Sequence, residues 1–165
     1  MKLTLNIRRA VVSDAPGLSD LAMRSKAVWG YDDDFLATCV DELTVTADQI
    51  AEHDVWLAER DGSAAEPIGF YDLAMGVHGR GTAELRLLFV DPSAKGTGVG
   101  GALWRHMVGR AGALDVKSVF LDADPFALPF YEHQGCVVVG QSPSGSIPGR
   151  FLPRLEKQLP GRTKP

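Results

Sequence analysis

The most informative stretch of this chain is Leu87-Leu88-Phe89-Val90-Asp91-Pro92-Ser93-Ala94-Lys95-Gly96-Thr97-Gly98-Val99-Gly100-Gly101-Ala102-Leu103. An apolar strand pattern stops at Asp91, a glycine-rich turn follows, and a helical pattern begins near Gly98. Glycines at alternate positions, from Gly96 to Gly100, leave backbone N–H groups uncovered by any Cβ. A helix that begins there adds unpaired N–H groups and the positive end of its dipole. The stretch therefore predicts an anion site suited to phosphate or pyrophosphate.

Length and composition indicate one globular domain. The chain has 165 residues, of which 45% are apolar and 23% charged. We expect the domain to cover residues 1–159 and a flexible tail to cover residues 160–165. A net charge of -4 and a pI near 5.5 argue against a nucleic-acid partner. No apolar run approaches the roughly 20 residues that span a bilayer, and the N-terminus lacks a signal-peptide core. We therefore expect a cytoplasmic protein with no membrane partner.

Cysteines and histidines give no sign of a metal site. Cys39 and Cys136 lie far apart in the sequence and match no metal-ligand spacing, so we expect core residues in a reducing compartment. The histidines are scattered, without a second ligand three or four positions away, at His53, His78, His106 and His133. The sequence therefore predicts no metal.

Helical and strand patterns before the glycine turn follow a clear order. A strand over residues 3–11 precedes a helix that Ser13 or Asp14 would cap, and Trp29-Gly30-Tyr31 interrupts this helix. A second helix is expected from residues 32–34 to about 43, and Thr46 with Gln49 resembles a capping box that opens a third. Strands are then expected over residues 55–60, 67–75 and 82–90, with turns at 61–62 and 78–81. These strands form an antiparallel meander that leads into the glycine turn.

The region after the turn alternates between helices and strands. We expect a helix over residues 98–113, a strand over 117–122 and a short helix over 126–134. A strand over 136–140, a loop over 142–149 and a last strand over 151–159 complete the chain. The pattern predicts one α+β domain.

The glycine turn has three possible interpretations: a dinucleotide site, a P-loop and a plain structural turn. Gly96-x-Gly98-x-x-Gly101 matches a dinucleotide fingerprint, with Asp122 or Asp124 at the end of the next strand. Against it, five residues separate the preceding strand from the first glycine, and that strand ends a meander. A P-loop would place its lysine after the glycines, whereas Lys95 precedes them. A plain structural turn seldom needs so many bare N–H groups.

The turn and a downstream segment together resemble a known family. Lys95-x-x-Gly98-x-Gly100, placed between a strand and an apolar helix, is similar to the Gln/Arg-x-x-Gly-x-Gly/Ala motif of the GNAT acyltransferases. Asp124-x-x-Ala127-x-x-Phe130-Tyr131-x-x-x-Gly135 resembles the family's Asn-x-x-Ala-x-x-Phe-Tyr-x-x-x-Gly segment. The departures are Lys95 for Arg or Gln and Asp124 for Asn. Lysine still offers a positive charge, but it lacks the planar guanidinium that can contact two oxygens at once. We expect Asp124 to cap the short helix. The resemblance covers nearly the whole chain and implies a mixed, mostly antiparallel sheet of about seven strands flanked by helices.

The resemblance also implies an acetyl-CoA-dependent N-acetyltransferase. It places the CoA pyrophosphate on the N–H groups from Lys95 to Gly100 and the pantetheine beside Leu88, Phe89 and Val90, whose N–H groups would hold the thioester oxygen. The residues that it assigns to cofactor binding are Leu88, Phe89, Val90, Lys95, Gly96, Thr97, Gly98, Val99, Gly100, Gly101, Asp124 and Phe130. Dimers are common in the family, so a homodimer is one expected assembly.

Two side chains are candidates for the proton transfers. A neutral phenol can protonate a departing thiolate, and its position in the Phe-Tyr pair makes Tyr131 the candidate general acid. Several family members use a glutamate where this chain has Glu84, which makes it a candidate general base. The alternative for Tyr131 is that it only packs beside Phe130. The alternative for Glu84 is that it is a surface carboxylate paired with Arg86 on the same strand face.

The acceptor side is specified less closely. Trp29 and Tyr31 offer an aromatic surface, and Asp33 with its neighbours offers carboxylates for a cationic amine, although these aspartates also suit a helix N-terminus. If Arg150 lines the site, the acceptor carries a carboxylate, as an amino acid or a peptide end does. We therefore expect a small-molecule or peptide amine as the acceptor. The rival functions are a catalytically silent acyl-CoA-binding module and a dinucleotide-dependent oxidoreductase domain.

Overall fold

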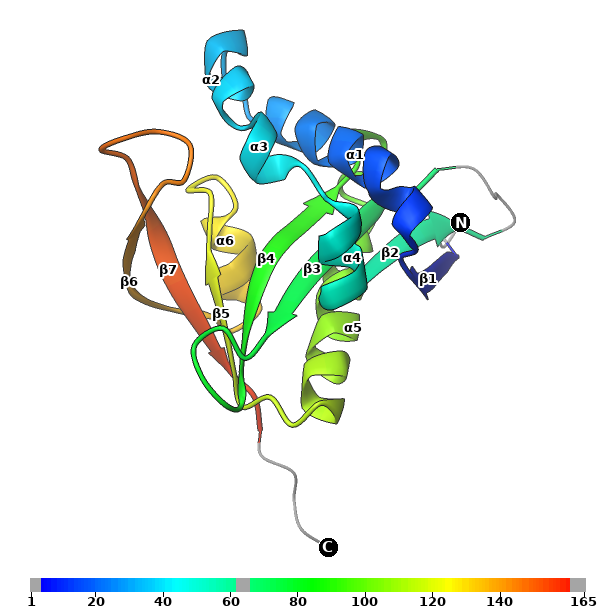
Figure 1. Ribbon diagram of the computed structural model, residues 1–165, viewed down its shortest axis with the longest axis vertical. Coiled ribbons are helices and arrows are strands. Elements are labelled where there is room, and N and C mark those ends of the chain that lie inside the picture. Colours follow the sequence, from blue (N-terminus) through cyan, green and yellow to red (C-terminus); the bar gives the residue numbers. More distant parts are fainter. Residues whose placement is uncertain (1–3, 62–65, 161–165) are drawn as a thin grey trace, which may run out of the picture.

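Seven strands form one mixed sheet at the centre of the molecule (Figure 1). The structure is a computed structural model that describes residues 4–61 and 66–160. The strands are β1 (Leu5–Arg9), β2 (Asp54–Arg60), β3 (Gly69–Met75), β4 (Thr82–Val90), β5 (Ser118–Asp122), β6 (Val137–Pro143) and β7 (Phe151–Gln158). They lie in the order β1-β2-β3-β4-β5-β7-β6, and only β4 and β5 pair in parallel. The expected α+β class and mostly antiparallel sheet are confirmed, and the order differs from the doubly wound parallel sheet of a dinucleotide-binding domain.

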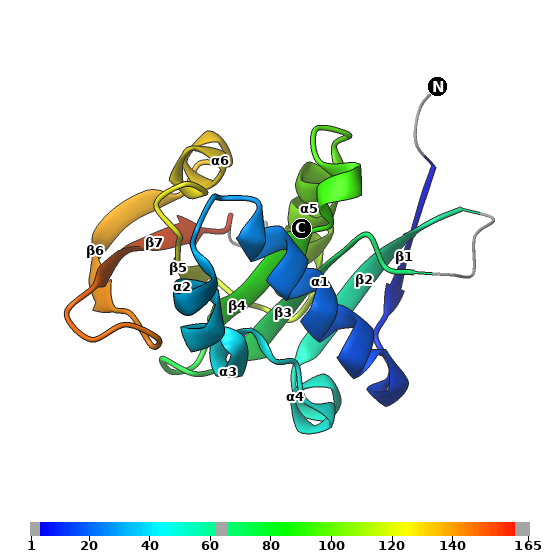
Figure 2. The ribbon, with the colours of Figure 1, turned by 90° about the horizontal axis from the view of Figure 1, so that it is seen from above.

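Helices cover both faces of this sheet. The helices are η1 (Val12–Asp14), α1 (Ala15–Ala27), α2 (Asp33–Thr38), α3 (Val40–Leu43), α4 (Ala47–Glu52), η2 (Pro92–Ala94), α5 (Val99–Ala113) and α6 (Leu128–His133), of which η1 and η2 are 3₁₀ helices. Figure 2 shows α1–α4 on one face and α5 and α6 on the other. Among the described residues, none of these helices combines the length and the apolar character that crossing a membrane requires.

Each face of the sheet has its own apolar core. On the α1 side, Leu18 and Leu21 pack over buried side chains of β2 and β3 that include Phe70. On the α5 side, Leu103 belongs to a second cluster, which includes the far side of the same strands. There a Cβ added to Gly69 would lie 2.8 Å from the Leu103 Cδ1, so only glycine lets α5 approach β3 this closely. The two cores hold β4 and the glycine turn in place from both sides.

Most expected elements are confirmed, and the differences are local. The capping box is present, because the Gln49 N–H donates to Thr46 Oγ1 at 3.1 Å and the Thr46 N–H to Gln49 Oε1 at 2.8 Å. The single helix expected up to about residue 43 is divided at Cys39 into α2 and α3. Asp14 precedes α1, but its carboxylate accepts from Arg8 and the Val11 N–H and not from α1. Residue 3 of the first expected strand, residue 62 of the expected turn and residues 161–165 of the expected tail lie outside the described residues.

Strand β4 is the element that shapes the site. Its pairing with β5 ends at Glu84 and Phe120, whereas β4 continues to Val90. Within the described residues, the second half of β4 therefore has a strand partner on the β3 side only. The Asp91 N–H reaches the Ile68 carbonyl on the β3 side, at 2.8 Å. Because alternate residues of a strand face the same edge, the N–H groups of Leu88 and Val90 face the open edge.

Candidate functional site

A cavity of about 820 Å³ lies along the open part of β4. Its lining comes from the end of α1, α3, the β3–β4 turn, β4, the turn before α5 and the start of α5, the β5–α6 connection, α6 and the β6–β7 hairpin. The residues expected at the site that line it are Trp29, Glu84, Leu88, Phe89, Val90, Lys95, Gly100, Asp124, Phe130, Tyr131 and Arg150. Segments that are distant in the sequence thus contribute donor-side and acceptor-side candidates to one space.

The glycine turn presents a row of free N–H groups. Gly96 and Gly98 have positive φ angles of 77° and 89°, which glycine adopts without strain. Gly98 precedes α5, whose first regular bond runs from the Ala102 N–H to the Gly98 carbonyl at 3.0 Å. Within the described part of the chain, the N–H groups of five residues have no hydrogen-bond partner: Gly96, Gly98, Val99, Gly100 and Gly101. Free N–H groups at a helix N-terminus can bind a phosphate or pyrophosphate.

The start of α5 lies against the open edge of β4. A Cβ added to Gly100 would lie 3.5 Å from both Val90 Cγ2 and Phe130 Cε2. The turn, the strand and α6 therefore meet at one point of the cavity wall. A ligand whose anionic part occupies the turn can extend from there along the N–H groups of Leu88 and Val90, as an added strand would.

Tyr131 lines the cavity from α6 and is almost fully buried. Its ring makes edge contacts with Trp104 and Phe130, at centroid distances of 5.9 Å and 5.2 Å. Burial raises the pKa of the Tyr131 phenol well above its usual value, and the nearby Cys136 adds to the rise. The hydroxyl therefore stays protonated at neutral pH and is able to donate a proton.

Glu84 lies in a cluster that joins four elements. Arg154 donates to Glu84 Oε1 and Oε2, at 2.8 Å each, and also to Asp122 Oδ1 at 3.0 Å. His78 Nε2 lies 2.8 Å from Glu84 Oε2 and 2.9 Å from an Arg154 nitrogen. The expectation that Glu84 pairs with Arg86 on one strand face is wrong. The register shift opposite Asp72 and Leu73 makes Arg86 a bulge residue, and its side chain is exposed.

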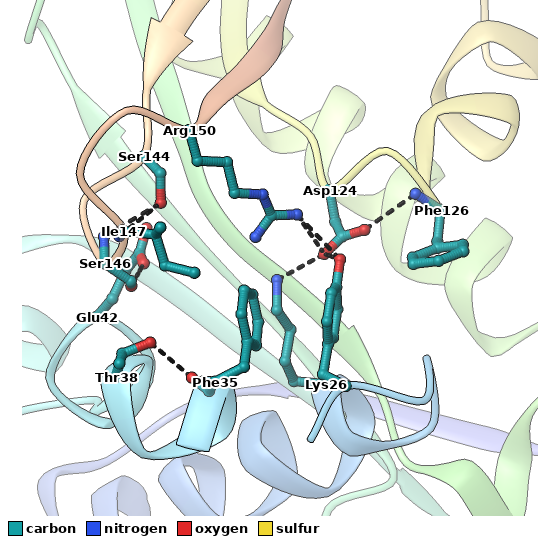
Figure 3. A network of polar contacts seen from close by, with 11 residues as sticks. Lys26, Phe35, Thr38, Glu42, Asp124, Phe126, Ser144, Ser146, Ile147 and Arg150 are labelled. Atoms are coloured by element: carbon teal, nitrogen blue, oxygen red, sulfur yellow. Dashed lines mark hydrogen bonds and ion pairs between the residues drawn. The ribbon is translucent and has the colours of Figure 1, made fainter. Parts of the chain in front are cut away.

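Asp124 is the centre of a second polar cluster (Figure 3). Its Oδ2 accepts from Lys26 Nζ at 2.7 Å and from the Tyr31 hydroxyl at 2.8 Å. Arg150 donates to the Tyr31 hydroxyl at 3.0 Å and comes within 3.9 Å of Asp124 Oδ2. Burial raises the pKa of Asp124, but the hydrogen bonds from Lys26 and the Phe126 N–H outweigh it, so the net shift is downward. The carboxylate stays charged and ties α1 to the β6–β7 loop.

The expected capping role of Asp124 is only partly met. Its Oδ1 accepts from the Phe126 N–H at 2.9 Å, whereas α6 begins at Leu128 and is preceded by Ala127, which makes no side-chain cap. Asp124 thus closes a turn ahead of the helix. Its second oxygen takes part in the network with α1 that the sequence did not indicate.

Two stacks of aromatic rings lie in or beside the cavity lining; of their members, Trp29 and Phe126 line the cavity. Trp29 stacks on Phe126 with a centroid distance of 5.5 Å and an interplanar angle of 7°. Lys95 Nζ lies 4.5 Å from the centre of the Trp29 ring, a cation–π contact that connects this stack to the glycine turn. Tyr31 stacks on Phe35 at 4.0 Å, beneath Arg150.

The remaining expected site residues lie outside the cavity lining. Asp33 is exposed in the first turn of α2, where its charge suits the helix N-terminus. Tyr31 reaches the site only through its hydroxyl. Gly96, Thr97 and Gly98 are exposed on the turn. Val99 is buried, and Gly101 follows it in the first turn of α5.

Several cavity residues were not indicated by the sequence reasoning. Arg154 stands four positions after Arg150, with Leu152 between them, and all three line the cavity. This alternation on the last strand is a usable signal, since alternate residues share one sheet face. His78 lies in a polar turn and Lys26 near the end of a helix, and neither position has a local pattern that marks it. Within the described residues, no group of three or more His, Cys, Asp or Glu side chains could hold a metal ion.

Comparison with known proteins agrees with this geometry. The model of the acetyltransferase (GNAT) family matches residues 21–136. The structure is similar to the PaiA N-acetyltransferase of Thermoplasma acidophilum in complex with coenzyme A, with 18% identity, a TM-score of 0.76 and coverage of 94% of this chain and 99% of that one. It is similar to a GCN5-related N-acetyltransferase of Rhodopseudomonas palustris, with 21% identity, a TM-score of 0.76 and coverage of 96% and 99%.

A third similar structure is also an N-acetyltransferase. It is the ribosomal-protein-S18-alanine N-acetyltransferase of Escherichia coli, with 16% identity, a TM-score of 0.68 and coverage of 98% of this chain and 97% of that one. No curated protein matches the chain in sequence.

Proposed function

Because the chain belongs to the GNAT family of acetyltransferases, we propose that it transfers an acetyl group from acetyl-CoA to a primary amine of a small molecule, an amino acid or a peptide. One observation carries the proposal. A single cavity joins the glycine turn, the open edge of β4 and Tyr131. These are the parts that a thioester donor needs: an anion site, an extended channel and a proton source.

The donor side of the cavity fits coenzyme A. The free N–H groups of the turn suit its pyrophosphate, and the Lys95 ammonium adds a positive charge. The N–H groups of Leu88 and Val90 suit the amide-rich pantetheine arm and the thioester oxygen, on which negative charge develops during the reaction. The Thermoplasma acidophilum neighbour was solved with coenzyme A, which supports the same ligand here.

Tyr131 acts as the general acid in this proposal. When the amine attacks the thioester carbon and the carbon–sulfur bond breaks, the departing thiolate needs a proton. The raised pKa of the Tyr131 phenol keeps its proton available at neutral pH. The Trp104 and Phe130 rings fix the orientation of the phenol.

Glu84 acts as the general base, directly or through a water molecule. Its Oε2 is occupied by Arg154 and His78, whereas Oε1 has one partner, an Arg154 nitrogen. A carboxylate oxygen has two lone pairs, so Oε1 can accept a proton from the attacking amine. Arg154 fixes the position of the carboxylate beside the cavity.

Ligand binding and thiol release test the proposal together. Acetyl-CoA and CoA should raise the melting temperature, whereas NADH and ATP should not, because only a ligand of the folded state stabilises it. A panel of amino acids, polyamines, aminoglycosides and peptides should then include acceptors that release the CoA thiol. Stabilisation by NADH alone would overturn the proposal. Acetyl-CoA binding without thiol release from any amine would identify a silent acyl-CoA-binding module instead.

A further inference from the structure

The cavity contains two charged clusters of opposite sign. At one end, Glu84 and Asp122 share a single guanidinium, that of Arg154, at distances of 2.8–3.0 Å. Because two carboxylates are paired with one cation, this cluster has a net negative charge. The neighbouring His78 adds positive charge only when protonated. This end therefore attracts an ammonium group.

The opposite end carries an excess positive charge. Lys26 forms an ion pair with Asp124 at 2.7 Å, and Arg150 adds a second cation to this one carboxylate. Only one terminal nitrogen of Arg150 is engaged, by the Tyr31 hydroxyl. Nε and the other terminal nitrogen have no hydrogen-bond partner in the described part of the chain. A guanidinium with two free donors suits a two-point contact with a carboxylate.

Three further charged residues line the cavity: Glu42, Arg86 and Lys95. Glu42 accepts a hydrogen bond from the Ser146 hydroxyl, whereas the Arg150 guanidinium points toward Asp124 (Figure 3). Arg86 is exposed at the bulge of β4 and forms no ion pair within the described residues. Lys95 lies over Trp29 at the glycine turn, on the donor side.

The two ends are held apart by one strand. Arg150 directly precedes β7, and Leu152 and Arg154 follow it at alternate positions within the strand; all three line the cavity. At a strand rise of about 3.3 Å per residue, the Cα atoms of the two arginines lie roughly 13 Å apart. The apolar Leu152 separates the two clusters.

We propose that the acceptor is a zwitterion with a primary amine and a free carboxylate, the carboxylate held by Arg150 and the amine directed toward Glu84. This inference rests on the proposed function and narrows its acceptor class to amino acids and short peptides with a free C-terminus. A polyamine or an aminoglycoside would place a further ammonium group against Lys26 and Arg150, where like charges repel. Arg150 acts here as a specificity-determining residue.

The test uses acceptors that differ only at the carboxylate. An amino acid, its carboxamide and the amine without the carboxyl group are compared by CoA release, and the set is repeated with a dipeptide and its amide. The wild type should use the carboxylate form with a kcat/KM about tenfold or more above that of the carboxamide. Arg150→Gln should remove most of this preference by raising KM for the carboxylate form, and leave the carboxamide rate within about twofold. Arg150→Lys should restore part of the preference, since it keeps the charge without the fork.

Arg60→Gln is the matched control, because Arg60 is exposed at the end of β2 and does not line the cavity. Calorimetric titration of each acceptor into the CoA-bound protein gives a second readout that does not depend on turnover. Equal use or binding of carboxylate and carboxamide by the wild type would overturn the inference. An equal loss of activity toward the carboxylate and the carboxamide in Arg150→Gln would also overturn it. Failure of acetyl-CoA to bind, or of every amine to release thiol, would instead count against the proposed function.

Discussion

The guanidinium of Arg154 binds both carboxylate oxygens of Glu84, at 2.8 Å each, across the point where β4 and β5 separate. The pair joins β4 to β7 and so spans the strand that lies between them. The ion pair raises the pKa of Arg154 further above its usual value, so this arginine stays charged at every accessible pH. The two strands thus hold the Glu84 carboxylate in a fixed orientation in the cavity wall.

Glu84→Gln should lower kcat at neutral pH by about 100-fold, the typical contribution of a general base. The amide cannot accept the proton of the acceptor ammonium. At higher pH, solvent removes that proton, so the variant should approach the wild-type rate. The measurement is the pH–rate profile of CoA release for both proteins.

Glu156→Gln is the control for this substitution. Glu156 lies on the same strand as Arg154, accepts from the Ser118 hydroxyl at 2.9 Å and does not line the cavity. Its replacement should leave the profile unchanged. A Glu84→Gln profile parallel to that of the wild type would remove Glu84 from the proton transfer.

Tyr131→Phe should lower kcat by about tenfold or more while the affinity for acetyl-CoA holds. The ring and its contacts remain, and only the donated proton is lost. Because the folded-state pKa of Tyr131 is raised, the phenol keeps its proton up to at least pH 10, so wild-type kcat should show no fall from this group between pH 7 and 10. Steady-state kinetics and calorimetric titration of CoA measure the two quantities.

A second buried tyrosine gives the matched control. Tyr71 is fully buried, and its hydroxyl lies 2.9 Å from His106 Nδ1, outside the cavity. Tyr71→Phe should cost about 1 kcal/mol of unfolding free energy and leave kcat unchanged. If both substitutions affect kcat equally, Tyr131 has no specific chemical role.

Gly100→Ala should weaken acetyl-CoA binding by about tenfold, or ~1.4 kcal/mol, without loss of stability. The added methyl would lie at ordinary contact distance, 3.5 Å, from Val90 and Phe130, so the fold tolerates it. It would, however, stand in the cavity wall beside the free N–H groups. Gly109→Ala, in the same helix with nothing within 4 Å, should raise stability by up to about 1 kcal/mol and leave binding unchanged.

The proposed donor side could be predicted from the sequence because its signals are local. The glycine turn, the helix after it and the Phe130-Tyr131 pair each occupy a few consecutive residues whose types set backbone conformation or chemistry. The resemblance to the GNAT family then assigned these segments to one cofactor site. The three meander strands and the capping box at Thr46 could be predicted for the same reason, since strand alternation and helix caps are properties of short segments.

The proposed acceptor side could not be predicted in the same way, because its contacts join distant segments. The partners of Asp124 lie 93 and 98 residues away, at Tyr31 and Lys26. Glu84 has its partner Arg154 at a separation of 70 residues. The local expectation, Glu84 with Arg86, failed because a bulge at Arg86 interrupts the alternation on which it depended. Side-chain partners across a sheet follow from topology and register, which no single segment encodes.

Asp54→Asn should reduce the unfolding free energy at neutral pH by about 1–3 kcal/mol, and less at low pH. Arg110 donates to both oxygens of the buried Asp54 carboxylate, at 2.9 and 2.8 Å, and holds α5 against β2. Burial raises the pKa of Asp54, but the bonds from Arg110 and Trp56 outweigh it and leave the pKa below its usual value. A carboxyl with a lowered folded-state pKa stabilises the fold above its unfolded pKa of about 3.9, and the gain is lost as the pH falls through the folded value. Urea unfolding at pH 7 and near pH 3 should therefore show a difference between wild type and variant that shrinks with acid. A difference that is the same at both pH values would mean that packing, and not the charge of Asp54, accounts for the loss.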